Sequence, residues 1–220
     1  MNTARLRTLL MIASLLLAAT ALSGCTQAYY SAMEQVGQHK RDILRSRIEA
    51  GREDQKEAQE QFKTTYEEFA EAARFDGGNL ESVYNRLNAE FERSEARAQD
   101  VTERIDSIER VAADLFREWK LEIDQYQSAR LRTQSEQSLR ETQGRYSQLI
   151  DAMRRAEAKM PPVLNAFRDQ VLFLKHNLNA RAVAALEDTL GEIENDVASL
   201  IRDIDVSIKE AESFLSQLPE

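Results

Sequence analysis

The sequence is poor in the residues that interrupt or cross-link a polypeptide. Its 220 residues include only three prolines, seven glycines and one cysteine. So few turn-forming residues argue against a β-sandwich, a barrel or a collagen-like chain. A single cysteine cannot form an internal disulfide or a thiolate metal cluster, and the two histidines cannot form a histidine-rich metal site. The net charge of −9 argues against a nucleic-acid-binding protein, which needs a basic face to displace counterions from phosphates.

The first 24 residues have the pattern of a bacterial export signal. Arg5 and Arg7 precede an apolar run over residues 9–19, which is too short for a membrane-spanning helix and typical of a secretory signal peptide. The run is followed by Leu22-Ser23-Gly24-Cys25, which resembles the lipobox of bacterial lipoproteins. The resemblance implies cleavage before Cys25 and acylation of its sulfur. The alternative is an ordinary signal peptide followed by an accidental cysteine.

These features predict how the chain is divided and where it is sent. We expect a signal peptide over residues 1–24 that is removed, a lipidated N-terminus and tether over 25–28, and a single helical coiled-coil domain over 29–220. Removal of the signal takes away two arginines and no acidic residue, so the net charge changes from −9 to −11. Several acyl chains on one cysteine hold a protein firmly on a bilayer. Because Arg5-Leu6-Arg7 is not a twin-arginine pair, we expect export by the Sec route. By analogy with Gram-negative lipoproteins, threonine rather than aspartate at position 26 predicts an outer-membrane lipoprotein facing the periplasm.

The rest of the chain has the composition and the periodicity of long helices. Residues 26–160 contain no proline and are rich in alanine, glutamate, glutamine, arginine and leucine, which are strong helix formers. Apolar residues recur every three or four positions from Val101 to Tyr126 and again from Leu186 to Leu218. Such narrow stripes bury against partner helices. The sequence therefore predicts an all-α protein, an elongated antiparallel helical bundle or coiled coil.

Two breaks in this pattern predict the topology. The glycines within Phe75–Asn79 and the prolines of Met160-Pro161-Pro162 divide the chain into three long helices, over about 28–75, 79–160 and 162–217. Folding back at both breaks gives a three-helix waist with a helical hairpin projecting at either end. Softer breaks lie at residues 128–138 and at Asn177–Asn179, and a fold at the first would give a compact four-helix bundle instead. We favour the extended form because both apolar stripes then find partners.

The sequence contains no recognisable reactive constellation. His39 and His176 have no histidine or cysteine three or four residues away, which argues against zinc ligation. We find no nucleophile elbow, phosphate-binding glycine loop or dinucleotide fingerprint. A narrow helical bundle offers few concave sites. We therefore expect no catalytic activity, metal, cofactor or small-molecule substrate.

The segment from residue 160 to 175 is unusually apolar, and Val171–Leu174 is apolar on all sides of a helix. One interpretation is burial by other helices. The other is a hairpin tip that contacts a protein partner or the bilayer, with Arg154, Arg155, Arg168 and Lys175 meeting phosphates. The candidate contact residues are Val163, Leu164, Phe167, Leu172, Phe173 and Leu174.

Basic residues cluster shortly after the expected lipid. Lys40, Arg41 and Arg45 are candidates for contact with anionic headgroups, where each would contribute about 1 kcal/mol. We expect instead that they pair with the acidic face of a neighbouring helix. Trp119 lies on the apolar stripe, so we expect it in the core.

Several blocks of the sequence resemble an uncharacterised family of Gram-negative lipoproteins defined by a domain of unknown function. The blocks are Ala32–Leu44, Phe75–Leu80, Phe116–Trp119 and Asp169–Ala180. The resemblance covers nearly all of the chain after Cys25. It implies a periplasmic helical lipoprotein and supplies no activity, ligand or catalytic residue.

Three functions are compatible with these features. The first is a non-enzymatic, lipid-anchored scaffold that presents helix surfaces to an envelope protein or to a second copy of itself. The second is a membrane-contacting or lipid-binding module acting through the 160–175 tip. The third is a regulator or activator of a cell-wall enzyme. We favour the scaffold because the sequence combines a lipid anchor with long amphipathic helices.

Overall fold

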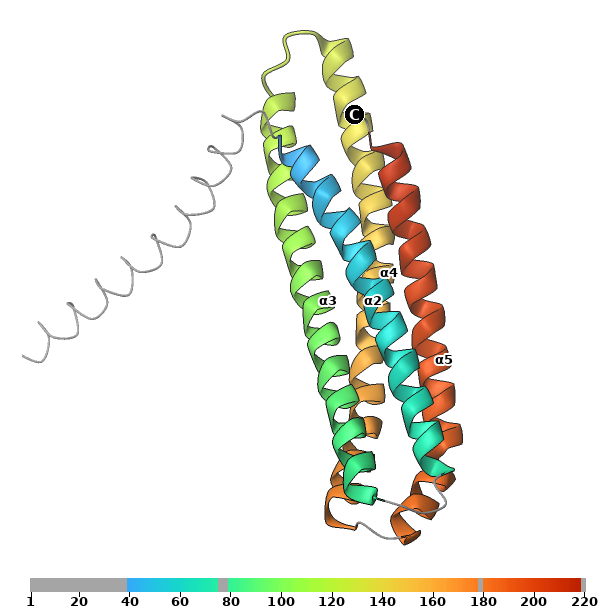
Figure 1. Cartoon of the computed structure of the whole chain (residues 1–220). Coiled ribbons are helices and arrows are strands. Elements are labelled where there is room, and N and C mark those ends of the chain that lie inside the picture. The colour runs from blue at the N-terminus through green and yellow to red at the C-terminus, as the bar shows by residue number, and fades with distance from the viewer. Residues whose placement is uncertain (1–38, 75–78, 178–179, 219–220) are drawn as a thin grey trace, which may run out of the picture. The chain divides into compact units, whose positions relative to one another are not determined.

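The computed structural model of the chain describes residues 39–74, 79–177 and 180–218. These residues form four α-helices and no strand: α2 (Lys40–Ala73), α3 (Leu80–Ile123), α4 (Ala129–His176) and α5 (Ala180–Gln217). The chain divides into two compact units, Met1–Ile43 and Leu44–Glu220. Within the second unit, successive helices run in opposite directions and form an antiparallel bundle (Figure 1). The predicted all-α helical bundle is thus confirmed.

Each helix of the bundle buries a stripe of side chains spaced three and four residues apart. On α4 the stripe consists of Leu149, Met153, Ala156, Met160, Val163 and Phe167, and none of these is more than 1% exposed. The ring of Phe167 stacks between two rings from α2, with centroids 6.3 Å from Phe62 and 5.0 Å from Phe69. This alternation of three and four is the spacing at which antiparallel helices interlock their side chains. The stripe on α4 therefore reaches across the core to α2.

The predicted break at Pro161–Pro162 is wrong, because α4 continues through both prolines. Proline has no N–H, so the carbonyls of Glu157 and Ala158 cannot receive their usual helical hydrogen bonds. Both prolines are exposed, whereas the flanking Met160 and Val163 are buried in the core. The burial of this continuous stripe offsets the unfavourable effect of proline in a helix interior.

The chain turns instead near the two softer breaks, although the first turn precedes the predicted range of 128–138, which is helical from Ala129 onward. Residues 124–128 separate α3 from α4, and Ser128 caps the new helix by accepting a hydrogen bond from the N–H of Leu131 at 3.4 Å. The second turn falls between the end of α4 at His176 and the start of α5 at Ala180. The three-helix waist is therefore wrong, and the four-helix bundle that was the alternative is correct.

The break predicted in Phe75–Asn79 is confirmed, since α2 ends at Ala73 and α3 begins at Leu80. Asn79 caps α3, and its side-chain oxygen accepts hydrogen bonds from the N–H groups of Glu81 and Ser82. The two glycines of this break lie outside the described residues.

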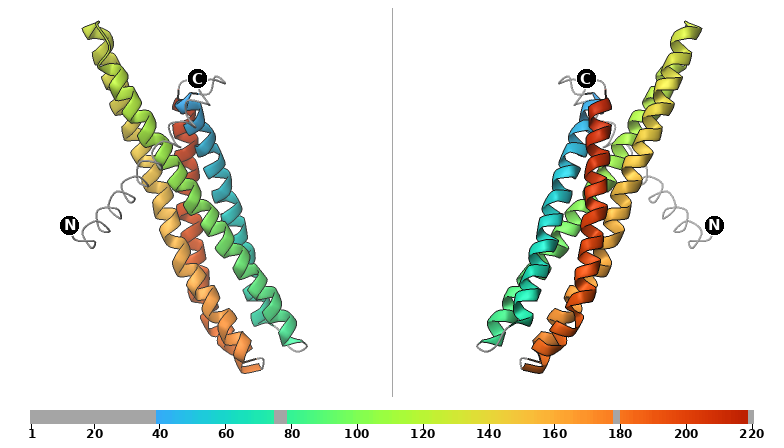
Figure 2. Two further views of the ribbon diagram at one scale, coloured as in Figure 1. Left: turned by 90° about the vertical axis from the view of Figure 1, so that its left-hand side faces the viewer. Right: turned by 90° about the vertical axis from the view of Figure 1, so that its right-hand side faces the viewer.

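The hairpin formed by α3 and α4 extends beyond the end of α5 (Figure 2). Tyr146 of α4 contacts Phe214 of α5 edge-on, with ring centroids 6.3 Å apart, which fixes the register of these helices. From Tyr146, α4 runs 17 residues back to Ala129, whereas α5 runs only three residues on from Phe214 to Gln217. At 1.5 Å per residue the overhang is about 20 Å. Trp119 lies in this part, where it is half-buried and donates to the hydroxyl of Ser135 at 2.9 Å.

Replacing both prolines by alanine tests the continuity of α4. In a continuous helix, Pro161→Ala/Pro162→Ala restores two backbone hydrogen bonds and removes two steric clashes. We expect the free energy of unfolding to rise by about 3 kcal/mol or more, as measured by urea unfolding of the non-lipidated chain with circular dichroism. An unchanged or lowered value would show that the chain turns at the prolines.

A pair of glycine substitutions tests the packing of α2 against α3. A methyl group at Gly51 would lie 2.9 Å from the buried Cδ1 atom of Ile108, whereas one at Gly144 would have no neighbour within 4 Å. Alanine in a helix is favoured over glycine by about 1 kcal/mol, and overpacking a core costs about 1–3 kcal/mol. We expect Gly144→Ala to stabilise the protein and Gly51→Ala to destabilise it by about 1 kcal/mol. Equal stabilisation by both variants would mean that the two helices do not approach closely at Gly51.

Candidate functional site

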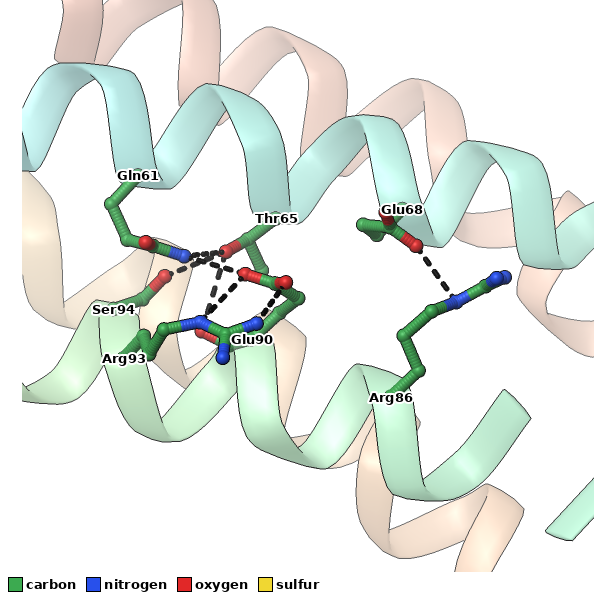
Figure 3. Close-up of polar contacts among 7 residues, drawn as sticks. All are labelled: Gln61, Thr65, Glu68, Arg86, Glu90, Arg93 and Ser94. Atoms are coloured by element: carbon green, nitrogen blue, oxygen red, sulfur yellow. Dashed lines mark hydrogen bonds and ion pairs between the residues drawn. The ribbon is translucent and has the colours of Figure 1, made fainter. Parts of the chain in front are cut away.

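A cluster of polar side chains lies between α2 and α3 and extends from the mainly apolar core to the surface (Figure 3). We name as the polar cluster Gln61 and Thr65 of α2 with Glu90, Arg93 and Ser94 of α3. The hydroxyl oxygens of Thr65 and Ser94 are 2.8 Å apart, and both residues are fully buried. Gln61 Nε2 donates to Thr65 Oγ1 at 3.0 Å and to Glu90 Oε2 at 2.8 Å. The cluster therefore joins the two helices through a connected set of hydrogen bonds.

Glu90 is the charged centre of the polar cluster, and it is only 8% exposed. Arg93 donates hydrogen bonds to both of its carboxylate oxygens, through Nε at 3.2 Å and through Nη2. These bonds, with a smaller contribution from Gln61, hold the pKa of Glu90 below its ordinary value, although burial acts in the opposite direction. Glu90 is therefore an ionised hydrogen-bond acceptor at neutral pH. It is poorly suited to act as a general acid.

A second buried polar contact joins α2 to α5. Ser207 donates from its hydroxyl to Oε1 of Gln55 at 2.8 Å, and both residues are at most 1% exposed. Gln55, like Thr65, occupies a position of the α2 stripe that faces the core. Polar residues at such positions can select helix partners and register, at some expense in stability. We interpret the polar cluster and the Gln55–Ser207 contact as elements that fix the alignment of α2.

Arginines on the outside of the bundle bind carboxylates of neighbouring helices. Arg154 of α4 donates to Asp106 at 2.6 Å, to Glu109 at 2.5 Å and to Glu157 at 2.8 Å. These hydrogen bonds, that to Glu109 first, raise the pKa of Arg154 above its ordinary value. Arg154 was a candidate for phosphate contact, and the structure places it in an ion-pair network instead.

Arg168, another candidate for phosphate contact, is also paired. Its Nη2 donates to Glu95 at 2.6 Å, and its guanidinium lies 5.5 Å from the centre of the Phe91 ring. Exposed pairs of this kind contribute little to stability individually. Together with the Arg154 network, they align α3 with α4.

The structure separates the six apolar contact candidates into buried and exposed residues. Val163, Phe167 and Leu174 are at most 1% exposed, and Leu164 is half-buried. Val163, Phe167 and Leu174 therefore belong to the core and not to a contact surface, and no hairpin tip exists near Pro161 because α4 does not turn there. Leu172 and Phe173 are different, with 47% and 39% of their surfaces exposed near the end of α4.

The candidates for headgroup contact also have different positions. Arg45 donates to the carbonyl oxygens of Leu215 at 3.3 Å and Leu218 at 2.8 Å, so it caps the C-terminal end of α5. Lys40 and Arg41 lie in the first turn of α2, within the other unit. Cys25 lies outside the described residues.

The histidines occupy helix ends. His39 immediately precedes α2, and its backbone N–H donates to Asp42 Oδ2 at 3.1 Å. His176 is the exposed last residue of α4. Among the residues that the structure describes, no group of three or more histidine, cysteine, aspartate or glutamate side chains could hold a metal ion.

A groove of about 630 Å³ lies between α3 and α4 beside the prolines. Its lining includes Glu95, Ala98, Glu157, Pro161 and Leu164. The two carboxylates are engaged by arginines, Glu95 by Arg168 and Glu157 by Arg154. The groove therefore combines small apolar surfaces with carboxylates that are already paired with arginines. Such a lining offers no free titratable group suited to acid–base catalysis.

Comparison with known families accounts for most of the chain. The profile of a family described as "Protein of unknown function (DUF2959)" matches residues 29–218. The chain belongs to this family. The match confirms the resemblance to a domain of unknown function, and it begins after the lipobox-like residues. No curated protein and no solved structure matches the chain significantly. In the described ranges, no helix of this family member is long and apolar enough to cross a membrane.

The polar cluster is the feature of this family member that the sequence analysis missed. The buried stripe on α2 consists of Leu44, Ile48, Gly51, Gln55, Ala58, Phe62, Thr65 and Phe69, at alternating intervals of four and three residues. The periodicity that predicts the helices is strongest over Val101–Tyr126 and Leu186–Leu218, whereas the polar Gln55 and Thr65 interrupt the apolar pattern on α2. Continuing the spacing beyond Ile48 would have placed Gln55 and Thr65 in the core.

Acid titration tests the role assigned to Glu90. Its lowered pKa means that the ionised form stabilises the fold above the ordinary value of 4.5 and that this contribution is lost as the pH falls through the lowered value. We expect Glu90→Gln to remove about 1 kcal/mol of stability at neutral pH and to flatten the decline below pH 4.5. Urea unfolding at a series of pH values would measure both effects. The control is Glu92→Gln, since Glu92 is exposed on the same helix. Equal pH profiles for wild type and Glu90→Gln would contradict the assignment.

Proposed function

We propose that the chain is a lipid-anchored helical scaffold of the cell envelope that presents one end of its bundle to an envelope protein. The observation that carries this proposal is the exposure of Leu172 and Phe173 near the end of α4. Two large apolar side chains that are adjacent in sequence and open to solvent are typical of contact surfaces. The scaffold needs no reactive group, in keeping with a groove whose carboxylates are engaged by arginines.

The anchor in this proposal is an acyl group on Cys25. The lipobox-like Leu22–Cys25 and the apolar run before it support export and lipidation. Thr26 supports delivery to the outer membrane, with the helical part in the periplasm.

The length of the bundle sets the distance between the anchored end of the scaffold and its exposed apolar pair. The chain enters the second unit at Leu44, and from there α2 runs to Ala73 over about 44 Å. The end of α4 lies at the other end of the bundle, where α2 ends and α5 begins (Figure 1). Leu172 and Phe173 are thus separated from the point of entry by the length of a helix. A surface at that distance could meet a partner that lies away from the bilayer.

Photocrosslinking in living cells tests this proposal. With a photoreactive residue in place of Phe173, we expect a discrete protein adduct. The matched control is Asp169, an exposed polar residue one turn earlier on α4, from which we expect little adduct. In the Cys25→Ser variant the adduct should decrease strongly, because the protein is no longer held at the membrane.

Each contrary outcome has a distinct meaning. Lipid adducts alone at Phe173 would favour a membrane-contacting module and contradict the scaffold. Equal adducts at Phe173 and Asp169 would show that the apolar pair is not a specific surface. An adduct with a cell-wall enzyme would support the scaffold and identify it as a regulator of that enzyme.

A further inference from the structure

The turn between α3 and α4 carries a second group of exposed apolar side chains. We name residues 120–132 the hairpin tip. Leu121 is 61% exposed, Tyr126 39% and Leu131 43%, and all three belong to this short segment. The tip is part of the hairpin that extends about 20 Å beyond α5, so α5 cannot cover it.

The charge of the hairpin tip differs from that of the whole chain. The tip contains Lys120, Arg130 and Arg132 against Glu122 and Asp124, a net charge of +1 in a chain with a net charge of −9. Arg132 also donates to the carbonyl oxygen of Tyr126 at 3.0 Å, which ties the turn together. Leucine, tyrosine and basic residues in one exposed segment suit the interface of a phospholipid bilayer. Tyrosine places its ring at headgroup level, and each basic residue near an anionic surface contributes about 1 kcal/mol.

The number of residues between Cys25 and α2 limits which end of the bundle can lie near the membrane. Fifteen residue steps separate Cys25 from Lys40, the first residue of α2, and even fully extended they span only about 50 Å. This is about the length of α2 itself, so Cys25 could reach the far end only if the tether ran straight back along the bundle. Within the second unit, Arg45 of α2 caps the C-terminal end of α5, and the hairpin tip projects beyond that same end (Figure 2). A bilayer that holds Cys25 is therefore much more accessible to the tip than to Phe173.

We propose that the hairpin tip inserts Leu121, Tyr126 and Leu131 into the interfacial layer of the bilayer that holds the acylated Cys25. The inference rests on the lipid anchor of the proposed function and adds a second point of contact. Three side chains would bind a membrane only weakly from solution. Tethering makes the contact intramolecular, so a weak interaction is sufficient. The bundle would then stand on the membrane and hold Phe173 away from it.

Tryptophan fluorescence can test this contact because the chain has a single tryptophan, Trp119. In a Trp119→Phe background, a Tyr126→Trp reporter marks the tip and a Phe173→Trp reporter marks the opposite end of the bundle. The lipidated full-length protein is reconstituted into vesicles of phosphatidylethanolamine with a minority of phosphatidylglycerol, with or without brominated acyl chains. We expect the tip reporter to shift to shorter wavelength and to be quenched by the brominated lipid. The reporter at position 173 should remain unquenched.

A further substitution tests the apolar contacts themselves. Leu121→Ser/Leu131→Ser should reduce the quenching of the tip reporter, and unchanged circular dichroism would confirm that the bundle is intact. Both positions are exposed, so folding should not depend on them. Quenching that is insensitive to these substitutions would overturn the proposed insertion.

Measuring the mass of the protein in the same sample distinguishes failure of this inference from failure of the proposed function. An acylated Cys25 with an unquenched tip reporter would overturn the inference and leave the scaffold intact. Quenching of the reporter at position 173 without quenching of the tip reporter would also overturn the inference. A tip reporter that shifts with protein concentration but is not quenched by lipid would identify a second copy as the occupant and also overturn it. A processed chain without acyl groups would remove the anchor, and both proposals would fail.

Discussion

The continuous apolar stripe along α4 is the constraint on which the rest of the bundle depends. Phe167 stacks between Phe62 and Phe69, so the stripe connects α4 to α2 across the core. Met160 and Val163 flank the prolines and are buried like the rest of the stripe. If α4 turned at the prolines, its two halves could not remain in phase against the same partners. The stripe therefore keeps the helix intact and moves the turns to residues 124–128 and to the end of α4.

The polar contacts determine how the helices align once the apolar stripes have brought them together. An apolar stripe tolerates sliding by a turn, because one large apolar residue can replace another at a given level. The hydrogen bonds of Thr65 with Ser94 and of Ser207 with Gln55 Oε1 can form in only one alignment. Arg45, which caps the end of α5, also favours this alignment of α2 with α5. The same alignment leaves apolar side chains exposed at both ends of the bundle, and these ends are the surfaces on which our functional proposals rest.

The sequence predicted the features that depend on local residues and periodicity. These include the all-α class and the break after α2. It failed where a distant contact outweighs a local preference, as when burial of Met160 and Val163 keeps a helix intact through two prolines. The composition of the apolar segment 160–175 left burial and surface contact open, because composition alone does not distinguish the faces of a helix. The three- and four-residue spacing that continues from Met160 places Val163, Phe167 and Leu174 on the face of α4 that packs in the core. Phe173 lies off this face and is exposed. The polar cluster was missed because polar residues at core positions break the pattern that reveals a stripe.

The distance between Arg117 and Glu141 tests the central claim most directly. Both residues are exposed, one on α3 and the other on α4. Spin labels at these positions in the Cys25→Ser chain should give a short distance, set by an interhelical spacing of about 10 Å. A single unbroken helix through residues 124–128 would separate the two positions by about 36 Å along its axis. A measured distance near that larger value would contradict the four-helix bundle and the overhanging hairpin together.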